Sequence, residues 1–389
     1  MHDASLTTIR TLLLLGAFYG TEGDDVRENL YYSTACRIGL LLDIPNLPTE
    51  SVVEKEMNVR LWWTLEMVDM WSSSGTQLPR AFTSRDGVQY PVEEAAFLQM
   101  HRTDLQLERP SGLDPAASLT TQMLKLNAIL AEIATMNRTV ALQQTNFNFD
   151  ATVKALTKKL DAWMAQLPPQ LHDTPQNLAT HASIGLGGMF VALYLGYYHY
   201  GQLLYFQYLH HNDNDEDLHG SFCADMCRSH STSLCDILYR AYRTPGAEVY
   251  YTMVGHVLVI ASAVQLHILL FSHDDAQIRA AKQRLEQNFN ILTKLQKLWP
   301  TIDNSFGRFT EFHRACEESK GSSAFRLDKW MLQFLLEFTR PVKGQREEAP
   351  PDIKDWSRQE LGLSPATSFA STHFRSLSMH SMSQPDLEF

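Results

Sequence analysis

Residues 56–79 constrain the fold of this chain more than any other stretch. Apolar side chains occupy almost every turn of it and leave only a narrow polar seam, in which Glu56 and Arg60 have the i, i+4 spacing of a favourable ion pair. A helix that is apolar on nearly all sides must be surrounded by other elements, so this stretch predicts the central helix of a large all-helical body. Its apolar side chains, among which Trp62 and Trp63 are predicted core residues, are Met57, Val59, Leu61, Trp62, Trp63, Leu65, Met67, Val68, Met70 and Trp71.

The rest of the chain, as far as residue 338, is also periodic in the manner of helices. No run alternates apolar and polar residues as a half-buried strand does, and Pro300 stands where a helix is expected to stop. The pattern predicts an all-α fold of about eleven helices, with Asp24 or Asp25 capping the second and Ser51 the central one. Besides the central helix, the expected helices span residues 6–19, 24–42, 119–142, 153–167, 174–212, 222–242, 249–273, 278–299, 305–316 and 324–338.

The composition changes after residue 340. Residues 341–389 are rich in serine and include Pro350 and Pro351. Such a segment buries too little apolar surface to offset the entropy lost on ordering, so we expect residues 1–340 to form one large domain and residues 341–389 a disordered tail. Ser378 follows Arg375 by three residues, as in sites of basic-directed kinases, and is a candidate phosphorylation site.

Charge and cysteine content narrow the class of protein. Hydrophobic residues make up 44% of the chain, which is enough for a large core, and the net charge is −11. A negatively charged chain without a basic stripe repels polyanions, so we expect no direct contact with nucleic acid. Five cysteines with no secretory signal before them predict a reduced, intracellular compartment.

Two segments raise the alternative of an integral membrane protein. Residues 174–212 and 249–273 contain no Asp, Glu, Lys or Arg, and each exceeds the length of about 20 residues that crosses a bilayer. Histidines and glutamines interrupt both segments, however, and their tyrosines are scattered instead of gathering at the ends. This pattern favours buried helices of a protein that does not cross a membrane.

No catalytic motif and no metal-binding spacing is convincing, so we predict neither a catalytic nor a metal-ligating residue. Cys223, Cys227 and His230 would share one helical face, but zinc sites usually add a closely spaced pair on a second element, so a buried core stripe is favoured. Asp69 lies inside an apolar helix and must find hydrogen-bond donors. We interpret it as a structural acceptor, with Arg37 as one candidate partner, in preference to a catalytic group.

One pattern of spaced residues runs from Gly39-Leu40 and Asp43, through Arg60-Leu61-Trp62-Trp63 and Asp69, to Gly75 and Pro79. It resembles the regulatory domain of fungal zinc-cluster transcription factors, known as the middle homology region. The family typically shows Gly-Leu and Asp at the end of one helix, Arg-Leu-Trp-Trp and Asp in the next, and then Gly and Pro. Leu41, Leu42 and Met70 depart from the family, which usually has His, Arg and Arg there. The matching residues are Gly39, Leu40, Asp43, Arg60, Leu61, Trp62, Trp63, Asp69, Gly75 and Pro79.

The resemblance implies a nuclear regulator of RNA polymerase II transcription and not an enzyme. In that family the all-helical domain transmits or restrains the activity of a DNA-binding module, is often a homodimer, and in some members responds to a small-molecule effector. Its expected partners are the transcription machinery or a DNA-binding partner. The family's six-cysteine zinc module would precede the first helix, and Met1 lies five residues before it. We therefore expect neither that module nor its zinc in this chain, and no other cofactor.

A soluble helical enzyme or ligand-binding protein remains the alternative, with a membrane protein behind it. The two uncharged segments bring polar aromatic side chains to helices that we expect to be buried, and such groups need hydrogen-bond partners. A core in which they pair with one another would satisfy this need, and so would a cavity that holds water or an effector. The hypothetical effector cavity is lined by Tyr197, Tyr198, His199, Tyr251, His256 and His267.

Overall fold

The computed structural model describes residues 4–337, except for residues 77, 83–84, 86, 101–113, 143–147, 211–217 and 319–324. Within these residues the chain forms thirteen α-helices and four short 3-10 helices, and no strand, which confirms the prediction of an all-α fold. The predicted tail, Ser378 and the division after residue 340 lie outside the described residues and stay predictions. The α-helices are α1 (Leu6–Thr21), α2 (Asp25–Leu42), α3 (Val52–Thr76), α4 (Glu94–Gln99), α5 (Leu119–Ala141), α6 (Phe149–Ala165), α7 (Pro175–Ser183), α8 (Gly187–Tyr205), α9 (Leu218–Ala241), α10 (Met253–Phe271), α11 (Asp275–Gln296), α12 (Ile302–Glu318) and α13 (Lys329–Leu336).

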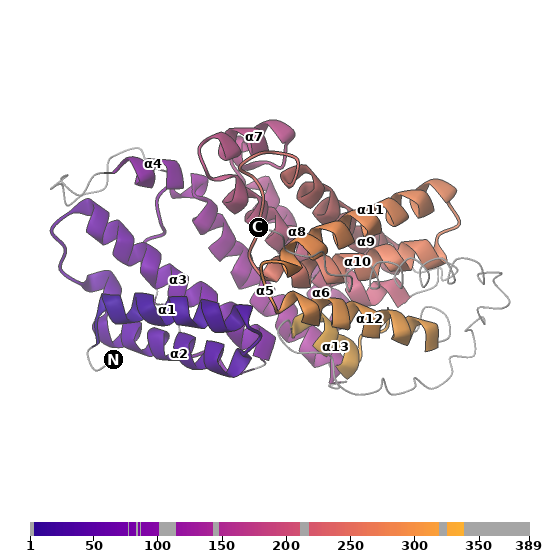
Figure 1. Cartoon of the computed structure of the whole chain (residues 1–389), viewed down its shortest axis with the longest axis horizontal. Coiled ribbons are helices and arrows are strands. Elements are labelled where there is room, and N and C mark those ends of the chain that lie inside the picture. The colour runs from indigo at the N-terminus through magenta and orange to yellow at the C-terminus, as the bar shows by residue number, and fades with distance from the viewer. Residues whose placement is uncertain are drawn as a thin grey trace, which may run out of the picture.

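Helices α1 to α3 form one end of the molecule (Figure 1). The side chain of Asp24 accepts a hydrogen bond from the backbone N–H of Arg27 and so caps α2, as predicted. Ser51 Oγ accepts from the N–H of Glu54 at 3.3 Å at the start of α3. The carboxylate of Glu54 reaches back to the N–H of Glu50 and completes the cap.

The prediction of one central helix is only partly right, because the molecule has two cores. Helix α3 is the centre of the smaller core, whereas α8 and α10 run through the larger one. The larger core draws on every helix from α5 to α13. The buried residues of the smaller core are Ile9, Leu12, Ala35, Cys36, Ile44, Val59, Leu61, Trp62, Trp63, Leu65, Phe82 and Leu124.

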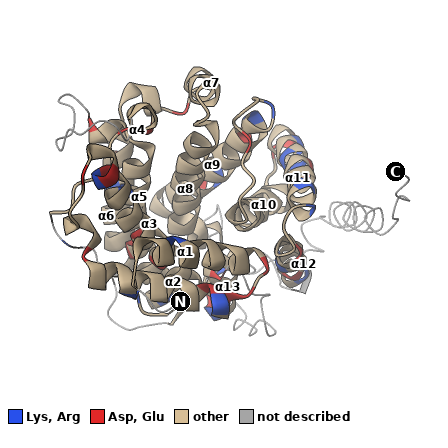
Figure 2. Ribbon diagram, turned by 60° about the vertical axis from the view of Figure 1, so that its left-hand side comes forward, with Lys and Arg blue, Asp and Glu red and all other residues tan. Residues whose placement is uncertain are grey.

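Helix α10 is buried on all sides by its neighbours. Among the described helices it alone has the length and mean hydropathy, 2.0, of a membrane span, and 89% of that window is buried inside the protein. A core helix of a large protein has the same composition. Figure 2 shows the contrast: α8 and α10 carry no charged residue, while Lys, Arg, Asp and Glu follow one another along the outer helix α11.

The uncharged segment at residues 174–212 is not one long helix, which corrects the prediction. It divides into α7 and α8 at Gly185, whose φ of 78° lies in the left-handed region that glycine adopts without strain. Helix α8 then begins at Gly187, where a Cβ would lie 2.4 Å from the carbonyl oxygen of Gly246. The chain turns here because glycine allows both the left-handed residue and the close approach of a second backbone.

Candidate functional site

Glu56 and Arg60 in the polar seam of α3 form the ion pair that their spacing predicts, and both side chains are turned toward the protein. Glu56 is fully buried and accepts a hydrogen bond from the N–H of Val92 at 2.9 Å. Arg60 donates to the carbonyl oxygen of Val92 at 2.7 Å and lies 3.6 Å from Glu94. Its Nε is also 3.2 Å from Glu56. The backbone N–H and carbonyl oxygen of Val92 therefore both form hydrogen bonds with this ion pair.

Asp69 is a saturated structural acceptor. Its carboxylate receives hydrogen bonds from the N–H of Ala81 at 2.9 Å, the N–H of Phe82 at 3.2 Å and the Nε of Arg80 at 3.0 Å. The expected partner Arg37 is exposed instead. The carboxylate thus holds the segment after α3 against the helix, and the donors that surround it leave no lone pair directed at a substrate.

The other motif residues join α2, α3 and the following segment. A Cβ at Gly39 would lie 2.4 Å from the side chain of Leu65, so the glycine allows α2 to pack closely on α3. Asp43 ends α2 with a left-handed φ of 52° and pairs with Arg85 at 2.6 Å. The remaining members are core or connecting residues: Leu40, Leu61, Trp62, Trp63 and Gly75 are buried or half-buried, and Pro79 is exposed.

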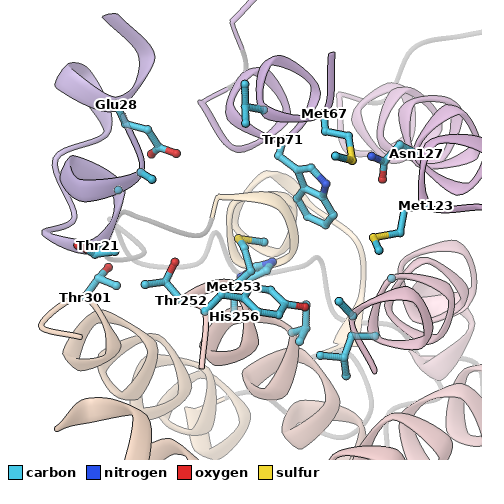
Figure 3. Close-up of a pocket in the computed structure, with 18 of the residues that line it drawn as sticks. Thr21, Glu28, Met67, Trp71, Met123, Asn127, Thr252, Met253, His256 and Thr301 are labelled. Atoms are coloured by element: carbon cyan, nitrogen blue, oxygen red, sulfur yellow. The ribbon is translucent and has the colours of Figure 1, made fainter. Parts of the chain in front are cut away.

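A cavity of about 540 Å³ lies where the two cores meet (Figure 3). Helices α1, α2 and α3 form one wall, and α5, α8, α10 and the start of α12 form the other. Its volume falls within the range of ligand pockets, roughly 300–1,000 Å³. The cavity is lined by Ala17, Gly20, Thr21, Glu28, Tyr32, Met67, Val68, Trp71, Met123, Leu126, Asn127, Ala192, Leu193, Leu195, Gly196, Tyr200, Tyr251, Thr252, Met253, His256, Val257, Trp299, Thr301 and Ser305.

One end of the cavity is polar. Glu28 points into it from α2, with the hydroxyl-bearing side chains of Thr21, Thr252 and Thr301 at the same end (Figure 3). The Glu28 residue is only 8% exposed. Burial, assisted by the nearby carboxylate of Asp25, raises the pKa of Glu28 to about 7. A carboxyl group with a pKa near 7 can gain or lose a proton at the pH of a cell, and its ionised form can pair with a cation.

The other end of the cavity is apolar. Met67, Trp71 and Met123 gather there (Figure 3). The polar groups nearby are satisfied, because the hydroxyl of Tyr200 donates to Oδ1 of Asn127 at 2.7 Å. This end therefore offers a bound molecule apolar surface and soft methionine side chains, which adapt to irregular shapes.

The structure brings only part of the predicted effector set to this cavity. Tyr251 and His256 line it. The other four side chains lie outside its lining: the ring of Tyr197 stacks on Trp163, the hydroxyl of Tyr198 donates to Asp173 at 2.7 Å, and Nε2 of His267 donates to the carbonyl oxygen of Leu209 at 2.8 Å, while His199 contacts the ring of His256. Effector binding itself stays a prediction.

Glu28 is the charged lining residue that the sequence analysis missed. The buried face of α2 carries Asp25, Glu28, Tyr32 and Cys36 at intervals of three and four residues. Two carboxylates on the buried stripe of an otherwise ordinary helix are unusual, because buried acids need partners. That pattern was available in the sequence, and it marks the wall of the cavity.

The cysteine and histidine residues of α9 face the interior. Cys223, Cys227 and His230 are all buried, and the ring of His230 packs on the backbone of Gly201 in α8. The thiol of Cys227 lies 3.8 Å from the carbonyl oxygen of Gln202, to which it donates. Among the described residues no group of three or more His, Cys, Asp or Glu side chains could hold a metal ion.

Comparisons with known proteins point to one class. No protein-family model and no solved structure matches the chain. Transcription factor yanR of Aspergillus niger is 25% identical over 300 residues, which cover 70% of this chain and 37% of yanR. An uncharacterized transcriptional regulatory protein of Schizosaccharomyces pombe, C1327.01c, is 27% identical over 176 residues, which cover 41% of this chain and 18% of that protein. The chain is thus similar to fungal transcription regulators, and it spans well under half the length of either relative.

Proposed function

We propose that this chain is a helical regulatory domain of a fungal transcription regulator, and that it acts in the nucleus on transcription by RNA polymerase II. The observation that carries the proposal is the similarity to transcription factor yanR along 70% of the chain. The motif residues around Trp62 and Asp69 add to it, because they fix the packing of α3 on α2 and on the segment that follows α3. Relatives that are transcription regulators favour regulation over catalysis.

The domain regulates without contacting DNA itself. Its net charge of −11 would repel the phosphate backbone, and positive and negative side chains are interspersed on its outer helices (Figure 2). The contact with DNA then belongs to a zinc-containing module or to a partner protein, and this domain holds no zinc. Its own partners are the transcription machinery, a DNA-binding partner or a second copy of the chain.

A tethering experiment tests this proposal. The chain is placed between a heterologous DNA-binding domain and an activation domain in a yeast reporter strain, beside the same fusion without the chain and one that carries Trp62→Ala. A regulatory domain should change reporter output several-fold, in either direction, and the core substitution should abolish the change. Equal output from all three fusions under every growth condition would contradict the proposal.

The cavity favours a second candidate function, that of a ligand-binding protein unrelated to transcription. Its volume of about 540 Å³ and its separate polar and apolar ends would suit such a role equally well. Fluorescence microscopy of the protein, tagged at its genomic locus, distinguishes the two functions. A regulator should accumulate in the nucleus, whereas a signal confined to the cytoplasm in all conditions would favour the second function.

A further inference from the structure

The carboxylate of Glu28 has no hydrogen-bond donor and no cation opposite it among the described residues. It packs on the backbone of α1, because a Cβ at Gly20 would lie 3.2 Å from its carboxyl carbon. With α1 on one side and only 8% of the residue exposed, the side chain is confined to the cavity (Figure 3). A buried carboxylate without donors is costly, so a donor in the cavity would stabilise the ionised form of Glu28.

Thr21, which lies at the same end of the cavity as Glu28, is an acceptor rather than a donor toward the cavity. The hydroxyl of Thr21 already donates to the carbonyl oxygen of Phe18 at 2.6 Å, so its lone pairs face outward as acceptors. That carboxylate and hydroxyl suit a head group with several N–H donors and a positive charge. An ammonium group provides both, a hydroxyl provides one donor, and a carboxylate would be repelled.

We propose that the cavity binds an amphipathic amine, whose protonated nitrogen pairs with Glu28 and whose compact apolar body lies against Met67, Trp71 and Met123. The proposal rests on the proposed function, since it names the chemical class of the effector. A molecule in this position contacts α1 and α2 on one wall and α8 and α10 on the other, and so connects the two cores. It therefore stabilises the arrangement of the cores that it binds.

Three probes that share an indole ring and differ in the head group test the inference: tryptamine, tryptophol and indole-3-acetate. Calorimetric titration of the full chain measures each affinity. A ligand of this size is expected to bind with a Kd on the order of 1 mM. Tryptamine should bind roughly tenfold more tightly than tryptophol, because a charge-assisted hydrogen bond is stronger than a neutral one, and indole-3-acetate should bind least.

The decisive variant is Glu28→Gln, which keeps the size of the side chain and removes its charge. We expect it to lower the affinity for tryptamine about tenfold and to leave tryptophol nearly unchanged. Glu132→Gln is the matched control, since Glu132 is an exposed carboxylate paired with Lys159, and it should change neither affinity. Circular dichroism verifies that both variants fold.

Three results would overturn the inference: no binding of any probe at about 5 mM, no preference of the wild-type chain for tryptamine, or a preference that Glu28→Gln retains. None of them depends on transcription. The binding series can therefore fail while the tethering experiment succeeds, which would leave the regulatory function in place and remove only the amine. If the tethering experiment fails but the binding series gives the predicted result, the ligand-binding alternative is favoured instead.

Discussion

Two buried carboxylates on neighbouring helices illustrate how surroundings decide the role of a residue. Asp69 of α3 accepts hydrogen bonds from two backbone N–H groups and an arginine, whereas Glu28 of α2 accepts none from the described residues. Donors surround the carboxylate of Asp69, whereas burial raises the pKa of Glu28 to about 7. Asp69 is therefore part of the architecture, and Glu28 is available to a ligand.

Replacement of Asp69 by alanine should destabilise the protein by roughly 3 kcal/mol or more. The substitution leaves the N–H groups of Ala81 and Phe82 and the guanidinium of Arg80 without their acceptor. Urea unfolding followed by circular dichroism measures the change. Asp225→Ala, which removes an exposed partner of Arg228, is the control and should cost less than about 1 kcal/mol. Equal effects of the two substitutions would contradict the structural role of Asp69.

Buried histidines predict that stability falls in acid. Burial lowers the pKa of His199 and His267 to about 3 and that of His230 to about 4, from an ordinary value of 6.5. The unfolded chain then binds more protons below pH 6.5, so this stability is present above that pH and is lost as the pH falls toward 4. Glu28, with its raised pKa, acts in the opposite direction between about pH 4.5 and 7, but it is one group against three.

Urea unfolding at three pH values measures this dependence. The values 7.5, 6.5 and 5.5 span about one pH unit on either side of the ordinary histidine pKa. We expect the free energy of unfolding to decrease at each step. His267→Gln retains a donor for the carbonyl oxygen of Leu209 and cannot titrate. It should reduce the slope by up to about 1.4 kcal/mol per pH unit below pH 6.5. A stability that does not fall toward pH 5.5 would contradict the lowered pKa values of these histidines.

At the level of elements, the sequence predicted what local patterns determine. The apolar surface of α3 and the caps at Asp24 and Ser51 depend on neighbours in the chain, and the structure has them as expected. The direction of the polar seam was not predictable, because Glu56 and Arg60 are buried by a segment about thirty residues away. Periodicity alone also could not place the break between α7 and α8, where Gly187 closely approaches the distant turn at Gly246.

Truncation of either tryptophan of α3 should destabilise the protein by about 3–5 kcal/mol. Trp62 is fully buried and packs edge-on against Phe82. Trp63 stacks on Tyr90 and donates to the carbonyl oxygen of Gln89 at 2.8 Å. Thermal unfolding of Trp62→Ala and Trp63→Ala measures the loss. An unchanged midpoint in both variants would refute the smaller core.

The start of α8 offers a sharper test with a matched pair of glycines. At Gly187 a Cβ would lie within 2.9 Å of three backbone atoms, so Gly187→Ala must displace either α8 or the turn at Gly246. At Gly307 in α12 a Cβ would meet nothing within 4 Å, so Gly307→Ala should stabilise the helix by about 0.5–1 kcal/mol. Thermal midpoints should therefore shift in opposite directions, and a gain in both variants would show that α8 does not approach that turn.

At the scale of the whole molecule, the cavity is a product of tertiary arrangement. Its lining comes from helices as far apart in sequence as α1 and α12, and helical periodicity does not specify which faces of such helices meet. Of the six residues that the sequence analysis predicted for an effector cavity, only Tyr251 and His256 are among the lining residues. The hydroxyl of Tyr198 pairs with Asp173 instead, in the manner of an ordinary core.

The position of the cavity suits the proposed regulation by an effector. Because it lies between the smaller core around α3 and the larger core around α10, a bound molecule bears on how the two cores pack. A ligand shifts such an arrangement only by its difference in affinity for the two states. An amine held by Glu28 on one wall and by apolar groups of both walls meets that requirement, since separation of the cores would break one set of contacts.

Two measurements made together test the regulatory function most directly. The first is chromatin immunoprecipitation, followed by sequencing of the bound DNA, of the protein tagged at its genomic locus. The second is sequencing of the transcripts of a deletion strain. We expect the tagged protein to be enriched at a limited set of promoters, and the genes next to those promoters to change expression in the deletion strain. The protein need not touch DNA itself for this result, because cross-linking also captures a partner-bound regulator. Chromatin profiles no different from those of an untagged strain, with no promoter-linked change in transcripts, would contradict a role in transcription.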